Sequence, residues 1–130
     1  MSTFETFEEI NAWQRARDLT KRVYQISGEG RFAHDFGLRD QMRRACISIM
    51  SNIAEGFERS GTKEFVQFLS VAKGSVGEVR SQLCVALDQQ YITEGTFEQL
   101  SAEAMEISRM LSGLMKYLRK AGIKGSKFKE

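Results

Sequence analysis

The sequence predicts an all-α protein, an antiparallel up-down-up-down four-helix bundle, from three observations. The 130-residue chain contains no proline, a residue that removes a backbone donor and clashes with the preceding helical turn. Four stretches carry apolar residues at alternating steps of three and four, which gives a helix one apolar face. Short glycine-containing turns separate the stretches, as between antiparallel neighbours in a bundle. We expect one domain over residues 1–122 and a short basic tail over residues 123–130.

The first predicted helix follows a capping-box pattern and ends at glycine. In Thr6–Glu9 the Thr6 hydroxyl can accept from the Glu9 amide, while the Glu9 carboxylate reaches back. Ser27–Gly30 ends the helix, because glycine readily adopts the left-handed closing conformation. The apolar seam of this helix consists of Ala12, Ala16, Leu19, Val23 and Ile26.

The second predicted helix begins after a connector that contains His34, the single histidine. Asp35 is a candidate N-cap, because its carboxylate can accept from an amide of the first turn. The helix is expected to run to about Glu55, with Gly56 as its terminator. Its apolar seam consists of Leu38, Met42, Ala45, Ile49 and Ile53.

The third predicted helix starts near Thr62, with Glu64 in its first turn, where a negative charge meets the helix dipole favourably. Gly74 and Gly77 lie inside it, and each is about 1 kcal/mol less favourable than alanine in a helix. They indicate either close approach of a neighbouring helix or loss of the helix there. The seam consists of Leu69, Ala72, Val76, Val79, Leu83 and Ala86.

The fourth predicted helix follows the turn Gly95–Thr96 and a second capping-box pattern at Thr96–Gln99. Gly122 closes it. Its seam consists of Leu100, Ala104, Ile107, Leu111, Leu114 and Leu118. Several large apolar residues lie off the four seams, namely Trp13, Tyr24, Phe65 and Phe68. Some of them can cap the bundle ends, and the remainder indicates burial by self-association.

Composition excludes several classes of protein. The hydrophobic content of 42% and charged content of 28% are typical of a soluble globular chain, and a net charge of +2 does not by itself imply nucleic acid. No stretch approaches the roughly 20 apolar residues of a membrane span, and the start does not resemble a signal peptide, so we expect a cytoplasmic protein. Cys46 and Cys84 lack the spacing of metal ligands and are expected to be buried free thiols. No cofactor is expected.

A row of polar side chains lies beside the seam of the second predicted helix. It consists of Gln41, Ser48, Asn52 and Glu55, with Ser75, Glu78 and Gln82 facing it from the third helix. Such residues are either buried and paired or line a site. A buried polar layer that fixes helix register is favoured over a ligand pocket.

Separated segments of the chain form a longer pattern. Its parts are Trp13-Gln14 with Ala16; Phe36-Gly37-Leu38, Gln41, Arg43-Arg44-Ala45 and Ser48-Ile49; Ser51-Asn52-Ile53-Ala54-Glu55-Gly56; and Arg59, Lys63-Glu64-Phe65, Phe68-Leu69, Ala72, Gly74-Ser75, Glu78 and Gln82-Leu83. This order resembles the bacterial 23S rRNA intervening-sequence proteins. The family usually has proline where Met50 stands and another near Ala33, so the shape of helix two and of the first connector can differ.

The resemblance implies a closed four-helix bundle that assembles into a ring of five. A related bundle, the accessory variability determinant of diversity-generating retroelements, is a basic pentamer that binds nucleic acid and a reverse transcriptase. The resemblance therefore implies RNA or DNA, and a protein such as a reverse transcriptase, as partners. It implies no reaction.

A set of basic residues provides the nucleic-acid candidates. They are Arg39, Arg43, Arg44, Arg59, Lys63, Lys116, Arg119, Lys120 and Lys124. Repeated around a ring they would form a basic belt whose phosphate contacts add up as counterions are released. The alternative is solvated charge interleaved with acids. The sequence shows no aromatic-interleaved single-strand platform, so the expected binding is salt-sensitive and indifferent to sequence.

An enzyme is the weakest interpretation. A di-iron bundle needs Glu-x-x-His pairs on two helices, and His34 is the single histidine. Glu55 and Glu78 could form a carboxylate pair, but ion-paired structural acids are commoner. The sequence thus predicts a non-enzymatic, homo-oligomeric bundle that associates with RNA, DNA or a nucleoprotein. The alternative is a protein–protein assembly module without a nucleic-acid role.

Overall fold

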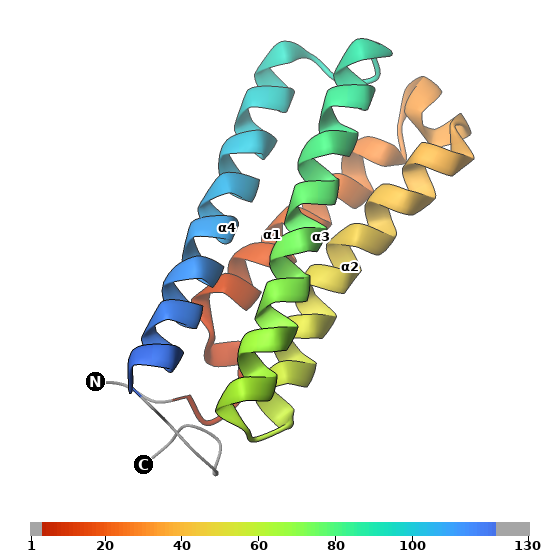
Figure 1. The fold of residues 1–130 in the computed structure, drawn as a ribbon. Helices are drawn as coiled ribbons and strands as arrows, with labels where there is room; N and C mark the ends of the chain where they lie inside the picture. The colour runs from red at the N-terminus through yellow and green to blue at the C-terminus, as the bar shows by residue number, and fades with distance from the viewer. Residues whose placement is uncertain (1–3, 122–130) are drawn as a thin grey trace.

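The computed structural model describes residues 4–121, which form four α-helices (Figure 1). These are α1 (Asn11–Ser27), α2 (Phe36–Glu58), α3 (Thr62–Asp88) and α4 (Glu94–Ala121), with short 3-10 turns η1 (Phe7–Glu9) and η2 (Gly30–His34). No strand occurs in this part of the chain, and the predicted all-α four-helix fold is confirmed. Gly122, Lys124 and the predicted tail lie outside the described residues.

The helices form a closed ring of neighbours. Helix α2 packs on α1 and α3, and α4 packs on α3 and α1. Figure 1 shows successive helices joined by short turns at alternating ends of the bundle. The last turns of α4 therefore lie at the same end as the α2–α3 turn, and η2 lies at the end that carries the α3–α4 turn.

The apolar seams supply most of the core. Every predicted seam residue is buried except Ile26, Leu38 and Leu114, which are half-buried. In α4 Met115 is buried in place of Leu114, because a straight helix drifts by about 20° per heptad against a strict seven-residue pattern. Phe65 was expected off the core but is fully buried, with its ring edge-to-face with Phe57 at 6.1 Å between centroids.

The helix starts agree only in part with the predicted caps. Asp35 caps α2 as expected, because its Oδ1 accepts from the Leu38 amide at 3.1 Å. The structure contradicts both predicted capping boxes. Thr6 makes no side-chain cap, and the Glu9 carboxylate accepts instead from the Glu5 amide at 3.0 Å. Thr93 provides the cap at α4 by accepting from the Thr96 amide at 3.1 Å, so this helix starts before Thr96.

Gly56 lies inside α2 and does not terminate it. An ideal Cβ at this position would lie 2.6 Å from Phe68 Cβ and 3.0 Å from Phe65 Cδ1 on α3. The absent side chain thus lets α3 pack directly on the α2 backbone. Gly74 and Gly77 behave differently, because α3 continues through both and an added Cβ would meet no atom within 4 Å at either. The close approach expected there does not occur within the described chain.

Replacing Gly56 and Gly77 by alanine should shift stability in opposite directions. Gly56→Ala should lower the free energy of unfolding by about 1–3 kcal/mol, because the new methyl overpacks against Phe68. Gly77→Ala, on the exposed surface of α3, should raise it by about 0.5–1 kcal/mol through helix propensity. Urea unfolding followed by circular dichroism measures both. Equal effects of the two substitutions would contradict the close α2–α3 contact.

Candidate nucleic-acid interface

The predicted basic set divides into two groups at different places in the fold. Arg39, Arg43 and Arg44 lie in the first half of α2, whereas Arg59 lies about 22–30 Å further along the axis, at the α2–α3 turn. Beyond that turn, Lys63 lies in the first turn of α3. The cations of the last turns of α4, namely Lys116, Arg119 and Lys120, lie at that second end of the bundle. The set is therefore not one patch within a single chain.

Arg39 and Arg43 tie the start of α2 to the preceding chain. Arg43 Nε donates to Ser27 Oγ at 2.9 Å and its Nη2 to the Tyr24 carbonyl at 3.3 Å, where the carbonyl end of α1 favours a cation. Arg39 Nη1 donates to the Ala33 carbonyl at 3.0 Å. Both guanidinium groups are therefore fixed in position while they keep their charge.

Three arginines lie over aromatic rings along α1 and α2. The distance from the guanidinium carbon to the ring centroid is 4.4 Å for Arg43 and Tyr24, 4.9 Å for Arg39 and Phe36, and 5.7 Å for Arg17 and Trp13. Such cation–π pairs add attraction between the charge and the ring face. With the exposed Ile47, these residues define what we call the α1–α2 face: Trp13, Arg17, Tyr24, Phe36, Arg39, Arg43 and Ile47.

On this face aromatic and basic side chains lie side by side in space, although the sequence alone shows no aromatic-interleaved pattern. Tyr24 and Phe36 remain 40% and 59% exposed. The Phe36–Arg39 pair follows from helical spacing, since residues three apart on a helix are neighbours. The Tyr24–Arg43 pair joins two helices, so neither local spacing nor composition could have indicated it.

Positive charge dominates the surroundings of Asp40, the acid of this part of α2. Arg39 Nε donates to Asp40 Oδ1 at 2.8 Å, and this bond holds the pKa of the Asp40 carboxyl below its usual value. The charges of Arg39, Arg44 and Arg43 act in the same direction. One carboxylate therefore faces several guanidinium groups, and the face keeps a net positive charge.

At the second end the cations are mixed with acids. Arg59 pairs with Glu55 at 2.9 Å and lies 5.1 Å from the Phe68 ring centroid. Lys63, Lys116, Arg119 and Lys120 are exposed. Glu58 and Glu64 are exposed nearby on α2 and α3, so these acids partly offset the charge of the cations at this end.

The polar row is only partly the buried layer that was predicted. Ser48 and Ser75 share a hydrogen bond of 2.8 Å across the α2–α3 contact, and Asn52 Nδ2 donates to Ser48 Oγ at 3.0 Å. Gln82 is half-buried, and its Oε1 has no partner among the described residues.

The outer members of that row, Gln41, Glu55 and Glu78, are exposed, so their predicted burial is wrong. They lie beyond the line on which α2 and α3 touch. Since Ser48 lies opposite Ser75 in the antiparallel pair, Glu55 and Glu78 are far apart along the bundle and do not form a carboxylate pair. Glu55 instead pairs with Arg59.

The two cysteines have opposite environments. Cys46 is buried in the core, and this burial raises the pKa of its thiol to about 12. Cys84 is exposed on α3, which corrects the prediction that both are buried. Across residues 4–121 no three histidine, cysteine or acidic side chains gather into a group that could hold a metal ion.

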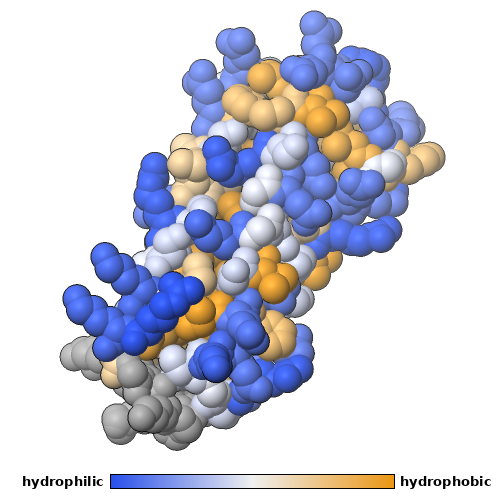
Figure 2. All heavy atoms as spheres, viewed as in Figure 1, coloured by the Kyte–Doolittle hydropathy of each residue, from blue (hydrophilic) through white to orange (hydrophobic). Residues whose placement is uncertain are grey.

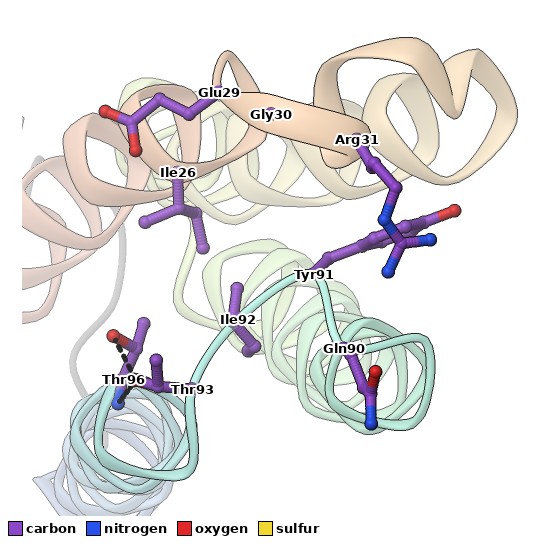
Figure 3. Close-up of a pocket in the computed structure, with 9 residues that line it drawn as sticks. All are labelled: Ile26, Glu29, Gly30, Arg31, Gln90, Tyr91, Ile92, Thr93 and Thr96. Carbon is purple, nitrogen blue, oxygen red and sulfur yellow. Dashed lines mark hydrogen bonds between the residues drawn. The ribbon is translucent and has the colours of Figure 1, made fainter.

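A pocket of about 580 Å³ opens between η2 and the α3–α4 turn (Figure 3). Ile26 and Ile92 point toward one another across it, and Arg31 lies beside Tyr91 at its other side. The lining residues are Ile26, Glu29, Gly30, Arg31, Gln90, Tyr91, Ile92, Thr93 and Thr96. Arg31 Nη2 donates to the Gln89 carbonyl at 2.9 Å, so this guanidinium also joins the two turns.

Tyr91 is the second link between these turns. Its hydroxyl donates to Asp35 Oδ2 at 2.9 Å, and its ring stacks on Phe32 at 5.2 Å between centroids. The hydrogen bond from the Tyr91 hydroxyl to the Asp35 carboxylate favours the protonated phenol, and this raises the pKa of Tyr91. Sequence reasoning missed Arg31 and Tyr91, because their partners lie more than fifty residues away along the chain.

These features define a class, the small four-helix bundle proteins. The chain belongs to the 23S rRNA-intervening sequence protein family, whose model matches residues 8–113. This confirms the resemblance found in the sequence. None of the helices within residues 4–121 is long and apolar enough to cross a membrane.

Comparison with solved structures supports the fold. The chain is similar to the crystal structure of a protein of unknown function from the S23 ribosomal protein family of Bacteroides thetaiotaomicron. The two share 21% identity with a TM-score of 0.73, over 81% of this chain and 95% of that chain. No curated protein matches the chain.

A thiol titration should separate the two cysteines. In the native protein Cys84 should react with a disulfide reagent within minutes, whereas Cys46 should react only after unfolding, because its core position and raised pKa suppress the thiolate. Cys84→Ser should abolish the fast reaction, and Cys46→Ser should leave it intact. Fast reaction of both thiols in the native state would contradict the burial of Cys46.

Proposed function

We propose that the protein is a non-enzymatic, homo-oligomeric accessory protein that binds RNA or DNA through exposed cations. The α1–α2 face carries this proposal, because Arg17, Arg39 and Arg43 lie there over aromatic rings while Asp40 is the acid among them. Guanidinium groups bind phosphate well, because their planar donors match its oxygens. Arg44 and the cations of the second end extend the contact.

We also propose that the oligomer is a ring of five and that the protein acts in the cytoplasm. The same proposal includes a protein partner, such as a reverse transcriptase, for this protein. Apolar side chains on the surface of one chain support self-association. On α3, Val71 and Val85 are 54% and 42% exposed and stand two heptads apart, on one side of the helix. Figure 2 shows apolar residues in several separate groups between hydrophilic ones on the visible face.

Binding should depend steeply on salt through the α1–α2 face. Anisotropy titrations with a labelled RNA over about 50 to 200 mM salt measure how steeply the association constant K falls with salt. The magnitude of the slope of log K against log salt is about 0.7 per neutralised phosphate for single strands and about 0.9 for duplexes. Arg17→Gln with Arg44→Gln, which removes one cation of this face and one exposed on α2 beside it, should reduce the slope by up to about 1.4 on a single strand. The matched pair Lys73→Gln with Arg80→Gln, two exposed cations of α3, should change it little.

Two results would count against this. Absence of any binding by the unmodified protein at the lowest salt and micromolar concentration would remove the proposed function. Equal losses in both double variants would show that charge acts from the whole surface and not from the α1–α2 face.

The protein in solution should have about five times the 14.8 kDa mass of the chain. Sedimentation velocity measures this directly. Val71→Asp should produce smaller species, because it places a charge in the apolar surface expected between copies. Ser70→Asp, on the adjacent but differently facing position of α3, serves as control. A single 14.8 kDa species of the unmodified protein would contradict the ring.

A further inference from the structure

We propose that the α1–α2 face, together with the hollow beside Phe36, is a stacking platform for single-stranded nucleic acid. This inference rests on the proposed function and specifies its ligand. Bases would lie on the exposed rings of Tyr24 and Phe36, while phosphates lie near Arg17 and Arg44. Three features of the structure carry it.

The first feature is the exposure of rings that the core does not need. Phe36 is 59% exposed, and it is the most exposed of the large apolar side chains among residues 4–121. Tyr24 is 40% exposed. Arg39 lies over the Phe36 ring and Arg43 over the Tyr24 ring, so a base would stack on the exposed ring surface that each guanidinium leaves uncovered. Bases stack on such rings whatever their identity, because each base has a π-face.

The second feature is that the two arginines over the rings are held in place before any ligand arrives. Arg43 is fixed by Ser27 Oγ and the Tyr24 carbonyl, and Arg39 by the Ala33 carbonyl and Asp40. The two arginines are four residues apart on α2, which places them about 6 Å apart along the axis. Side chains already ordered lose little entropy on binding.

The third feature is a hollow of about 600 Å³ next to Phe36. It is lined by Arg31, His34, Asp35, Phe36, Gly37 and Tyr91. This volume lies within the range of about 300–1,000 Å³ that small-molecule sites occupy. One wall is the Phe36 ring, and another is Tyr91 with Arg31 5.3 Å from its ring centroid. A base that leaves the strand beside Phe36 can thus enter a space lined by two aromatic rings, the Arg31 guanidinium and the Asp35 carboxylate, which already accepts from Tyr91 and Leu38.

The geometry selects a single strand over a duplex. In a duplex each base is covered by its neighbours, so its faces are closed to protein rings. In a single strand the bases can separate and stack on side chains. RNA and DNA share this chemistry, and parallel titrations with unstructured RNA and DNA of the same length distinguish them.

The test compares loss of a ring with loss of a charge. Phe36→Ala should weaken binding of an unstructured oligonucleotide by about 5- to 150-fold, the range for one stacked base, and should leave the salt slope unchanged. Phe36→Trp should restore binding, with quenching of the new indole by the bound bases. Val85→Ala, which also truncates an exposed apolar residue but keeps the α3 surface apolar, is the matched control and should sediment and bind like the unmodified protein. The three variants and the unmodified protein should all bind a duplex with the same weak affinity.

The outcomes separate the two proposals. If the unmodified protein binds no nucleic acid, the proposed function and the platform both fail. If it binds with a steep salt dependence but Phe36→Ala and Tyr24→Leu bind as well as Val85→Ala, the platform is wrong and the proposed function stands. If Phe36→Ala changes the sedimentation coefficient, the face is a contact between copies, which also overturns the platform.

Discussion

The direct packing of α2 on α3 is the constraint on which the rest of the structure depends. Gly56 has no side chain, so Phe65 and Phe68 of α3 reach the α2 backbone, and Ser48 and Ser75 share a hydrogen bond across the same contact. The short connector η2 places the first half of α2 at the end of the bundle where α1 ends. The arginines of α2 can then reach the final carbonyls of α1.

Those arginines serve the fold and the surface at once. Arg43 satisfies acceptors at the end of α1 and covers one side of Tyr24, while Arg39 does the same for the η2 backbone and Phe36. Arg43 is held by neutral acceptors, so its charge is not offset by them, whereas Arg39 also pairs with the Asp40 carboxylate. The contacts that close this end of the bundle therefore also produce a positively charged aromatic surface.

Much of the fold follows from patterns within single helices. The four seams, the Asp35 cap and the start of α3 need only local periodicity and capping chemistry, and these predictions agree with the structure. Predictions failed where the outcome depends on a partner helix. Gly56 is a residue type that commonly ends helices, but here it lies inside α2, where α3 packs on it through Phe68. Gln41 and Glu78 have the spacing of a buried row, but they lie outside the line of α2–α3 contact.

In the candidate site too, features within one helix could be predicted from the sequence, whereas those that depend on a partner helix could not. Arg39 and Arg43 could be selected from the sequence as cations, but the rings that accompany them come partly from another helix. The hollow beside Phe36 joins η2 to the α3–α4 turn, which the sequence places more than fifty residues apart. The hydrogen bond from Tyr91 to Asp35 joins the α1–α2 hairpin to the α3–α4 hairpin at that end of the molecule. A ligand held there touches both hairpins, so its binding energy resists their separation and adds to the free energy of unfolding.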